Sequence, residues 1–291
     1  MLPRATSPLL ESPPMHRTRF ASVAYLNALP LTWGLTRGSL TEGIDLLAVP
    51  PCDAAGLLAD GRVDVALIPS IEFARMAGLT AIPGTGIAAL REVRSVLLLS
   101  RVEPSRIRTL GVDRNSRTSV ALTQLILRHR YRCRPAVEPM PPDPDRMLAT
   151  RDAALIIGDP ALAASIGPVR GVTHVIDLAQ EWYALTGLPF VFAFWACRPV
   201  VPVPGIAALL EASLEEGLAG IDVISAEAAG RNGLPAGIIA AYLRNNIRYR
   251  LGGAETRSLR LFFGMCGEEG LVDRYARPAP PAMSSAAVNS E

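Results

Sequence analysis

A run of polar side chains between an apolar strand and an apolar helix is the part of this sequence best suited to binding a small molecule. Its members are Ser116, Arg117, Thr118 and Ser119. They follow a predicted strand over residues 110–113 and lead into a predicted helix over residues 119–130. The first N–H groups of a helix lack intrahelical partners and carry partial positive charge, so hydroxyls placed there favour an anion. The run therefore predicts contacts to a small carboxylate. Arg117 can also bind such a carboxylate through two hydrogen bonds, and the alternative is that its side chain points to solvent. A capping role for Ser116 alone is the structural alternative.

Two further polar side chains stand at the ends of apolar strands. Asn27 follows a predicted strand over residues 20–25, and Ser95 begins another over residues 95–100. An amide can donate to a carboxylate and accept from a hydroxyl at once, so we expect Asn27 to face the same ligand from a second lobe. A turn or capping role for Asn27 and an internal hydrogen bond for Ser95 are the alternatives.

Two strand ends supply weaker candidates. Ser70 comes shortly after the apolar strand that is predicted over residues 63–68, and Gly158 follows the strand predicted over residues 154–157. The hydroxyl of Ser70 can bind a ligand, and the glycine permits close approach of a ligand to the backbone, so both residues are candidates for substrate contact. For Ser70 the structural alternative is a turn that starts a helix, with Glu72 favouring the helix dipole. We expect Asp159 to cap a helix instead, because its carboxylate would repel an anionic ligand.

A predicted loop over residues 182–190 precedes an aromatic strand. Thr186 and Gly187 lie in this loop, and we expect them to close a ligand crevice. They complete the set of candidate substrate-binding residues.

The elements that must position these residues alternate between strands and helices up to about residue 198, which predicts α/β layers with a mainly parallel sheet. Four helical segments follow, over residues 206–219, 223–230, 235–245 and 254–266. We expect two lobes with the ligand crevice between them. Lobe one would hold residues 18–108 and 199–277, and lobe two residues 109–198, with disordered tails over 1–17 and 278–291.

Composition excludes several classes of protein. The net charge of +2 gives no electrostatic case for nucleic-acid binding, and no apolar run reaches membrane-spanning length. All 29 residues counted as Lys or Arg are Arg, which excludes Schiff-base and Walker-type lysine chemistry. The His and Cys residues lack metal-ligand spacing, so we expect no metal. The N-terminus lacks a secretory pattern, so we expect a cytoplasmic protein. The sequence specifies no oligomeric state.

Six motifs occur in a fixed order along the chain: Y-L-N-x-x-P-L at 25–31, D-x-A-L-I-P-S-I-E at 64–72, R-S-V-L-L-x-S at 94–100, D-x-x-S-R-T-S at 113–119, L-I-I-G-D at 155–159 and T-G-L-P-F-V-F-A at 186–193. Over residues 20–270 the chain resembles the chorismate dehydratase family of the futalosine route to menaquinone. The resemblance implies the two-lobed fold of type II periplasmic binding proteins. It also implies loss of water from chorismate to give 3-[(1-carboxyvinyl)oxy]benzoate, without metal or organic cofactor.

The same resemblance implies roles for single residues. The asparagine of the Y-L-N motif matches Asn27, and the serine of the R-S-V strand matches Ser95, which makes both catalytic candidates. The family's hydroxyl run matches the run at residues 116–119. Two other functions stay open: a non-catalytic receptor for a small carboxylate, and the sister enzyme 1,4-dihydroxy-6-naphthoate synthase. The sister family uses a late histidine base, for which His174 is the candidate here.

Overall fold

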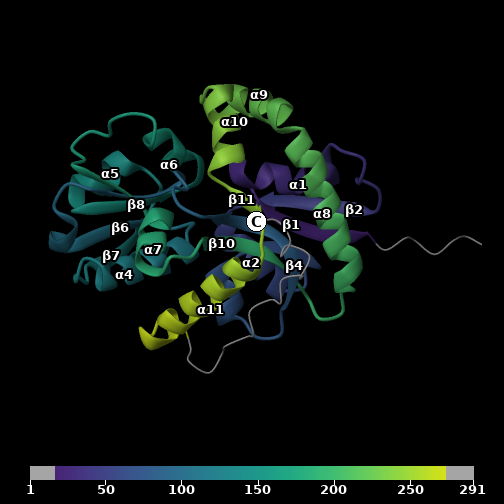
Figure 1. Cartoon of the computed structure of the whole chain (residues 1–291), viewed down its shortest axis with the longest axis horizontal. Helices are drawn as coiled ribbons and strands as arrows, with labels where there is room; N and C mark the ends of the chain where they lie inside the picture. Colours follow the sequence, from purple (N-terminus) through teal and green to yellow (C-terminus); the bar gives the residue numbers. More distant parts are fainter. Residues whose placement is uncertain (1–16, 273–291) are drawn as a thin grey trace, which may run out of the picture.

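The computed structural model describes residues 17–272 and forms two lobes, each built on one mixed sheet covered by helices (Figure 1). The sheet of lobe one has the order β11 (Arg248–Arg250), β4 (Thr80–Ala89), β10 (Phe190–Cys197), β3 (Val65–Pro69), β1 (Thr18–Val23) and β2 (Ile44–Val49). The sheet of lobe two has the order β7 (Ala136–Met140), β6 (Thr109–Asp113), β8 (Ala153–Ile157), β5 (Val96–Ser100) and β9 (His174–Asp177). The expected two-lobed α/β fold is confirmed. The expected tails lie almost wholly outside the described residues.

The sheets are mixed and not mainly parallel as expected. Strands β1, β2 and β3 pair in parallel, as do β6, β7 and β8. The strands β5 and β10 run antiparallel to both of their neighbours. An apolar run shows that a strand is buried, but it does not show its direction.

The strand pairing places the two crossings between lobes earlier than residues 108 and 198. The chain enters lobe two between β4 and β5, and it returns to lobe one between helix α7 (Leu178–Thr186) and β10. Residues 96–100 therefore belong to the sheet of lobe two, and residues 190–197 to that of lobe one. Both strands are buried along their whole length, so their composition fits either sheet.

Helices cover both sheets. In lobe one they are α1 (Leu29–Thr36), α2 (Pro51–Ala59), α3 (Ser70–Arg75), α8 (Val203–Ala219), α9 (Ile221–Asn232), α10 (Ala236–Asn245) and α11 (Gly253–Glu268). In lobe two they are α4 (Thr118–His129), α5 (Pro144–Thr150), α6 (Gly158–Ala164) and α7. Short 3-10 turns are η1 (Leu26–Ala28) and η2 (Pro104–Arg106). The four helices expected after residue 198 are confirmed, but the loop expected over residues 182–190 is wrong because residues up to Thr186 end α7.

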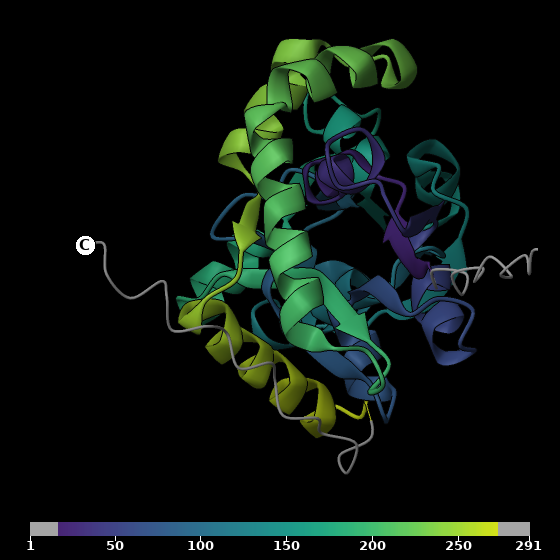
Figure 2. The same cartoon turned by 90° about the vertical axis from the view of Figure 1, so that its right-hand side faces the viewer.

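The two lobes share a packed base on the side of α11, which runs beneath them (Figure 2). This helix contacts β10 and α3 of lobe one and α4 of lobe two. The indole of Trp182 in α7 donates to Ser258 Oγ in α11 at 2.9 Å. It also packs edge-on against Phe190 and Phe262. Aromatic packing of this kind fixes the relative position of the lobes at their base.

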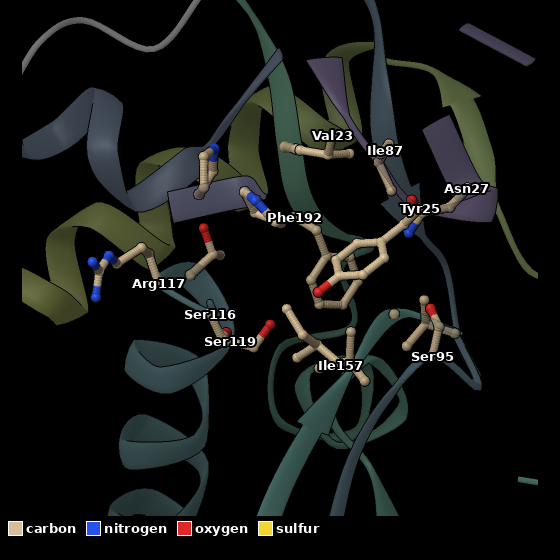
Figure 3. A pocket seen from close by; sticks show the side chains of 17 residues that line it. Val23, Tyr25, Asn27, Ile87, Ser95, Ser116, Arg117, Ser119, Ile157 and Phe192 are labelled. Carbon is tan, nitrogen blue, oxygen red and sulfur yellow. The ribbon is translucent and has the colours of Figure 1, made fainter. Parts of the chain in front are cut away.

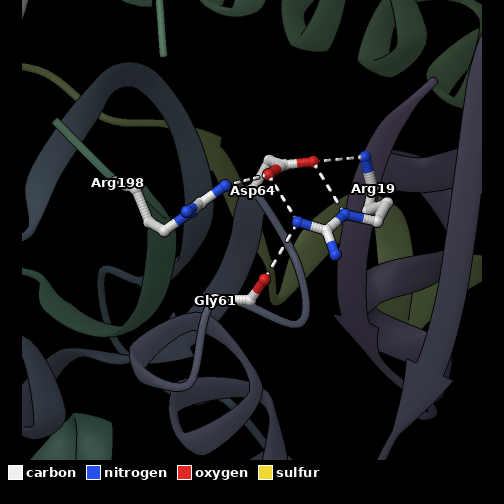
Figure 4. Close-up of polar contacts among 4 residues, drawn as sticks. All are labelled: Arg19, Gly61, Asp64 and Arg198. Carbon is white, nitrogen blue, oxygen red and sulfur yellow. Dashed lines mark hydrogen bonds and ion pairs between the residues drawn. The ribbon is translucent and has the colours of Figure 1, made fainter. Parts of the chain in front are cut away.

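A buried carboxylate ties three segments of lobe one together (Figure 4). Asp64 accepts from the backbone N–H and the guanidinium of Arg19 on β1, at 2.9–3.1 Å, and from the guanidinium of Arg198 after β10. Arg19 also donates to the carbonyl of Gly61 at 2.9 Å. The hydrogen bonds from Arg19 hold the pKa of Asp64 well below its ordinary value.

We expect Asp64→Asn to lower the free energy of unfolding by about 1–2 kcal/mol at pH 7, since both guanidinium groups keep partial solvent screening. Because the folded-state pKa is depressed, the carboxylate stabilises the fold above about pH 4, the unfolded value, and loses this effect as the pH falls. Urea titrations of wild type and variant at pH 7 and pH 3 measure the difference. Asp45→Asn, which removes an exposed partner of Arg17, is the control and should cost less than about 0.5 kcal/mol. An equal difference at both pH values would contradict the assignment.

No helix within residues 17–272 is long and apolar enough to cross a bilayer.

Candidate functional site

A cavity with about 540 Å³ of empty space, part of it open to solvent, lies where the two lobes meet (Figure 3). Its wall is mainly apolar, formed by Val23, Pro51, Pro69, Ile87, Val93, Val96, Ile157, Phe192 and Ala193. Its polar lining residues are Tyr25, Asn27, Ser95, Ser116, Arg117, Thr118 and Ser119. None of the lining residues is Asp, Glu, His or Cys, so the wall itself supplies no ordinary side-chain base. In residues 17–272 no group of three His, Cys, Asp or Glu side chains is arranged to hold a metal ion.

Asn27 enters the cavity from the 3-10 turn η1 at the end of β1. Two backbone hydrogen bonds hold the turn: the N–H of Leu26 donates to the carboxylate of Asp159 in lobe two at 3.1 Å, and the N–H of Ala28 donates to the carbonyl of Tyr25 at 3.0 Å. The N-cap of α1 is Ala28, so the capping alternative for Asn27 is wrong. The amide oxygen of Asn27 is buried and has no hydrogen-bond partner. A buried polar atom without a partner is uncommon, and at a cavity wall it indicates a place for a ligand donor.

Ser95 lies in the segment through which the chain crosses into lobe two. The preceding residue, Arg94, has φ +60, a backbone conformation that is uncommon for residues other than glycine. Its N–H donates to the carboxylate of Asp177 at 2.7 Å, and the same carboxylate caps α7. Burial raises the pKa of Asp177, against the opposing effect of these hydrogen bonds. The crossing segment is thus held by the half-buried carboxylate of Asp177, which fixes the position of Ser95.

Tyr242 of α10 lies directly behind these two residues and was not predicted. Its hydroxyl donates to Ser95 Oγ at 2.8 Å, and the side chain of Asn27 also hydrogen-bonds to it. Tyr242 is 1% exposed and does not itself line the cavity. The helix α10 presents Ile239 and Leu243 to the core on the same face, so a sequence pattern marks Tyr242 only as a core residue.

The hydroxyl run forms the opposite wall at the N-terminus of α4. The carboxylate of Asp113 at the end of β6 accepts from the N–H of Asn115 at 2.9 Å, which shapes the turn into the helix. The hydroxyl of Ser116 is buried without a partner, and the N-cap Arg117 makes no side-chain cap. A purely capping role for Ser116 is therefore wrong. Ser116 and Ser119 lie on the same side of the cavity (Figure 3).

Thr118 and Ser70 join the lobes beside the cavity. The hydroxyl of Ser70 donates to the carbonyl of Val191 at 2.8 Å, which uses its single hydrogen. The hydroxyl of Thr118 therefore donates to Ser70 at 3.4 Å, and it also accepts from the N–H of Ile71 at 3.2 Å. Thr118 lines the cavity with its hydroxyl already engaged, and Ser70 does not line it. Both hydroxyls therefore take part in the hydrogen bond between Thr118 of lobe two and Ser70 of lobe one.

Tyr25 lines this cavity and also a second one beside α1 and α9. Its phenol points into the first cavity toward the side of Ser119 (Figure 3). Burial, reinforced by the charges of Asp113 and Asp159, raises the pKa of Tyr25, so the phenol is a hydrogen-bond donor at neutral pH. Gly158 lies under the ring with φ +66, and a Cβ built on it would be 2.7 Å from the Tyr25 ring.

Three other predicted site residues have different positions from those expected. The guanidinium of Arg117 extends away from the space that Tyr25 and Ser119 face (Figure 3). Thr186 donates to the carbonyl of Trp182 at 2.8 Å at the end of α7, and Gly187, with φ +71, terminates that helix. Neither Thr186 nor Gly187 lines the cavity, because the segment expected to be a loop is helical. Asp159 also stays out of the cavity, as expected, and its carboxylate accepts from the N–H of Leu26 across the lobes. The expected capping role of Asp159 is wrong, because the N-cap of α6 is Ile157 and that helix has no side-chain cap.

We compared the sequence of this chain with protein-family models and with curated proteins. The model of a family described as "Menaquinone biosynthesis" matches residues 18–268. The chain belongs to this family. A curated relative, the chorismate dehydratase of Thermus thermophilus, is 30% identical over 258 residues, which cover 82% of this chain and 91% of the relative.

Solved structures show the fold. A protein of Archaeoglobus fulgidus aligns with a TM-score of 0.69 at 16% identity, over 88% of this chain and 99% of that one. The periplasmic aliphatic sulphonate binding protein of Escherichia coli aligns with a TM-score of 0.65 at 16% identity, over 96% and 97%. The expected periplasmic-binding-protein architecture is therefore confirmed for this member of the menaquinone biosynthesis family.

Proposed function

We propose that this protein is a chorismate dehydratase. The observation that carries the proposal is a pair of buried, unpartnered oxygens, Asn27 Oδ1 and Ser116 Oγ, in opposite walls of an otherwise apolar cavity. Such a cavity suits a flat ring with polar groups at both ends. Chorismate has a ring carboxylate at one end and a C4 hydroxyl at the other, with an enolpyruvyl ether at C3. The family relationship supports the same substrate.

The reaction removes the C3 proton and the C4 hydroxyl. The electron pair of the C3–H bond forms the new C3–C4 π bond, the C4–O bond breaks, and the proton joins the departing hydroxide as water. The ring becomes aromatic, which supplies driving force without a cofactor. Since the cavity wall holds no ordinary side-chain base, the enolpyruvyl carboxylate of the substrate itself is the proposed acceptor of the C3 proton.

The cavity residues would then bind the ring carboxylate, bind the leaving hydroxyl and hold the ring in position. Ser116, Ser119 and the N-terminus of α4 would bind the ring carboxylate and stabilise the negative charge that spreads onto it. Asn27 and Ser95, at the other wall, would hold the C4 hydroxyl as it leaves. The apolar side chains would fix the ring and exclude water. The enolpyruvyl carboxylate would then stay close to the C3 proton, and the C4 hydroxyl close to Asn27 and Ser95.

Purified protein incubated with chorismate tests the proposal by ultraviolet absorbance and mass spectrometry. We expect loss of chorismate and appearance of a product lighter by one water. Binding without consumption would identify a receptor instead. Turnover of cyclic dehypoxanthine futalosine would identify the sister synthase, although His174 lies outside the cavity, beside Glu103 at 3.4 Å.

The hydroxyl wall gives a separate prediction. We expect Ser119→Ala to raise KM for chorismate about tenfold, since a hydrogen bond to a charged group contributes about 1.5 kcal/mol at the lower end of its range. Thr123→Val is the control: this hydroxyl lies one turn further along α4, donates to the carbonyl of Ser119 at 2.7 Å and does not line the cavity. Steady-state kinetics of both variants measure the effect, and an unchanged KM for Ser119→Ala would place the carboxylate site elsewhere.

A further inference from the structure

The hydrogen bonds behind Asn27 and Ser95 have a defined direction, and the Tyr242 hydroxyl sets it. Tyr242 has one hydrogen, which it gives to Ser95 Oγ at 2.8 Å. The phenol oxygen can then only accept from Asn27, so the group of Asn27 that faces it is the NH₂. The amide oxygen of Asn27 is left buried and without a partner in the cavity wall, in agreement with this assignment.

The same chain of hydrogen bonds determines what each group offers a ligand. Ser95 Oγ accepts from Tyr242, so its own hydrogen is free to point into the cavity that Ser95 lines. Asn27 donates to Tyr242, so its oxygen is the part that accepts from a ligand. The wall thus presents one donor and one acceptor side by side. An alcohol group, which accepts one hydrogen bond and donates another, is the ligand group that satisfies both.

We propose that Tyr242 is a positioning residue that orients Ser95 as a donor and Asn27 as an acceptor toward the hydroxyl group that leaves the substrate. This inference rests on the proposed dehydration. A donor aimed at the departing oxygen stabilises the charge that develops there as the C–O bond breaks, so it matters more in the transition state than in the bound substrate. Removing the Tyr242 hydroxyl would let the side chains of Ser95 and Asn27 rotate or pair with each other.

Burial raises the pKa of Tyr242, although its bonds with Ser95 and Asn27 act in the opposite direction. The phenol therefore stays protonated throughout the neutral range. Its contribution is orientation, and we expect the shape of the pH profile of kcat to be the same with and without it.

Tyr242→Phe tests the inference, with Tyr249→Phe as a matched control. Tyr249 on β11 is also buried, at 5% exposure, and its hydroxyl has no hydrogen-bond partner. We expect Tyr242→Phe to lower kcat for chorismate about 10- to 30-fold with KM within about twofold, as the loss of an orienting hydrogen bond would do. Tyr249→Phe should keep kcat within about twofold, because no partner is lost. Thermal unfolding of both variants checks that the fold is retained.

A double-mutant cycle with Ser95→Ala separates orientation from packing. If Tyr242 acts through Ser95, adding Tyr242→Phe to Ser95→Ala should lower kcat much less than it does in the wild type. A kcat within twofold of wild type for Tyr242→Phe, equal losses for both tyrosine variants, or fully additive losses with Ser95→Ala would overturn the inference. A wild-type protein that does not consume chorismate would instead contradict the proposed function, so the two failures are distinguishable.

Discussion

Asn27→Ala is expected to lower kcat for chorismate about 10³-fold, at the upper end of the effect of losing one preorganised polar group. Its amide oxygen is the unpartnered acceptor on its side of the cavity, and its amide nitrogen hydrogen-bonds to Tyr242. The substitution therefore removes a direct contact to the substrate and also loosens the hydrogen-bond chain to Ser95. Few other polar groups in that wall can replace it.

Steady-state kinetics with chorismate, together with thermal unfolding, measure this effect. Asn245→Ala is the control, because Asn245 is exposed at the end of α10 and does not line the cavity. It should behave like the wild type. A kcat for Asn27→Ala within about threefold of wild type, equivalent to about 0.7 kcal/mol in the barrier, would remove Asn27 from the mechanism.

Gly158→Ala is expected to lower kcat/KM about 10²-fold, because a displacement of about 1 Å in a substrate-positioning group has an effect of this size. The new Cβ would lie 2.7 Å from the Tyr25 ring, so the ring has to move out of its place in the cavity wall. The backbone at φ +66 also disfavours alanine, which adds a loss of about 1–2 kcal/mol in stability.

Gly187→Ala separates these two effects. Gly187 has nearly the same backbone conformation, φ +71, but a Cβ there has no neighbour within 4 Å and the residue does not line the cavity. We expect a similar loss of stability with little loss of activity. Equal losses of kcat/KM in both variants would show that backbone strain, and not the position of Tyr25, controls the site. If Gly187→Ala changed KM alone, this result would support the original expectation that Gly187 contacts the substrate.

The local sequence was enough to predict those parts of the site that are each formed by a single short segment. The turn after β1 and the N-terminus of α4 are encoded by apolar strands that end in an amide or in hydroxyls, and residues of both line the cavity. Tyr25 was within reach of the same reasoning, since it stands two positions before Asn27. The helical C-terminal third was also predictable, because an apolar stripe with helical spacing is a local pattern.

Contacts between distant segments were decided only by the tertiary structure. Tyr242 and Ser95 are 147 positions apart, and nothing in an apolar helix distinguishes a tyrosine that packs in the core from one that holds a site residue. The hydroxyl of Thr118 is hydrogen-bonded to Ser70 and to the N–H of Ile71. The sequence of the hydroxyl run does not show that these contacts occupy it. The sheet that receives β5 or β10 is likewise set by its hydrogen-bonded neighbours. The order of apolar and polar residues within a segment indicates its burial and periodicity, whereas its partners depend on how the whole chain folds.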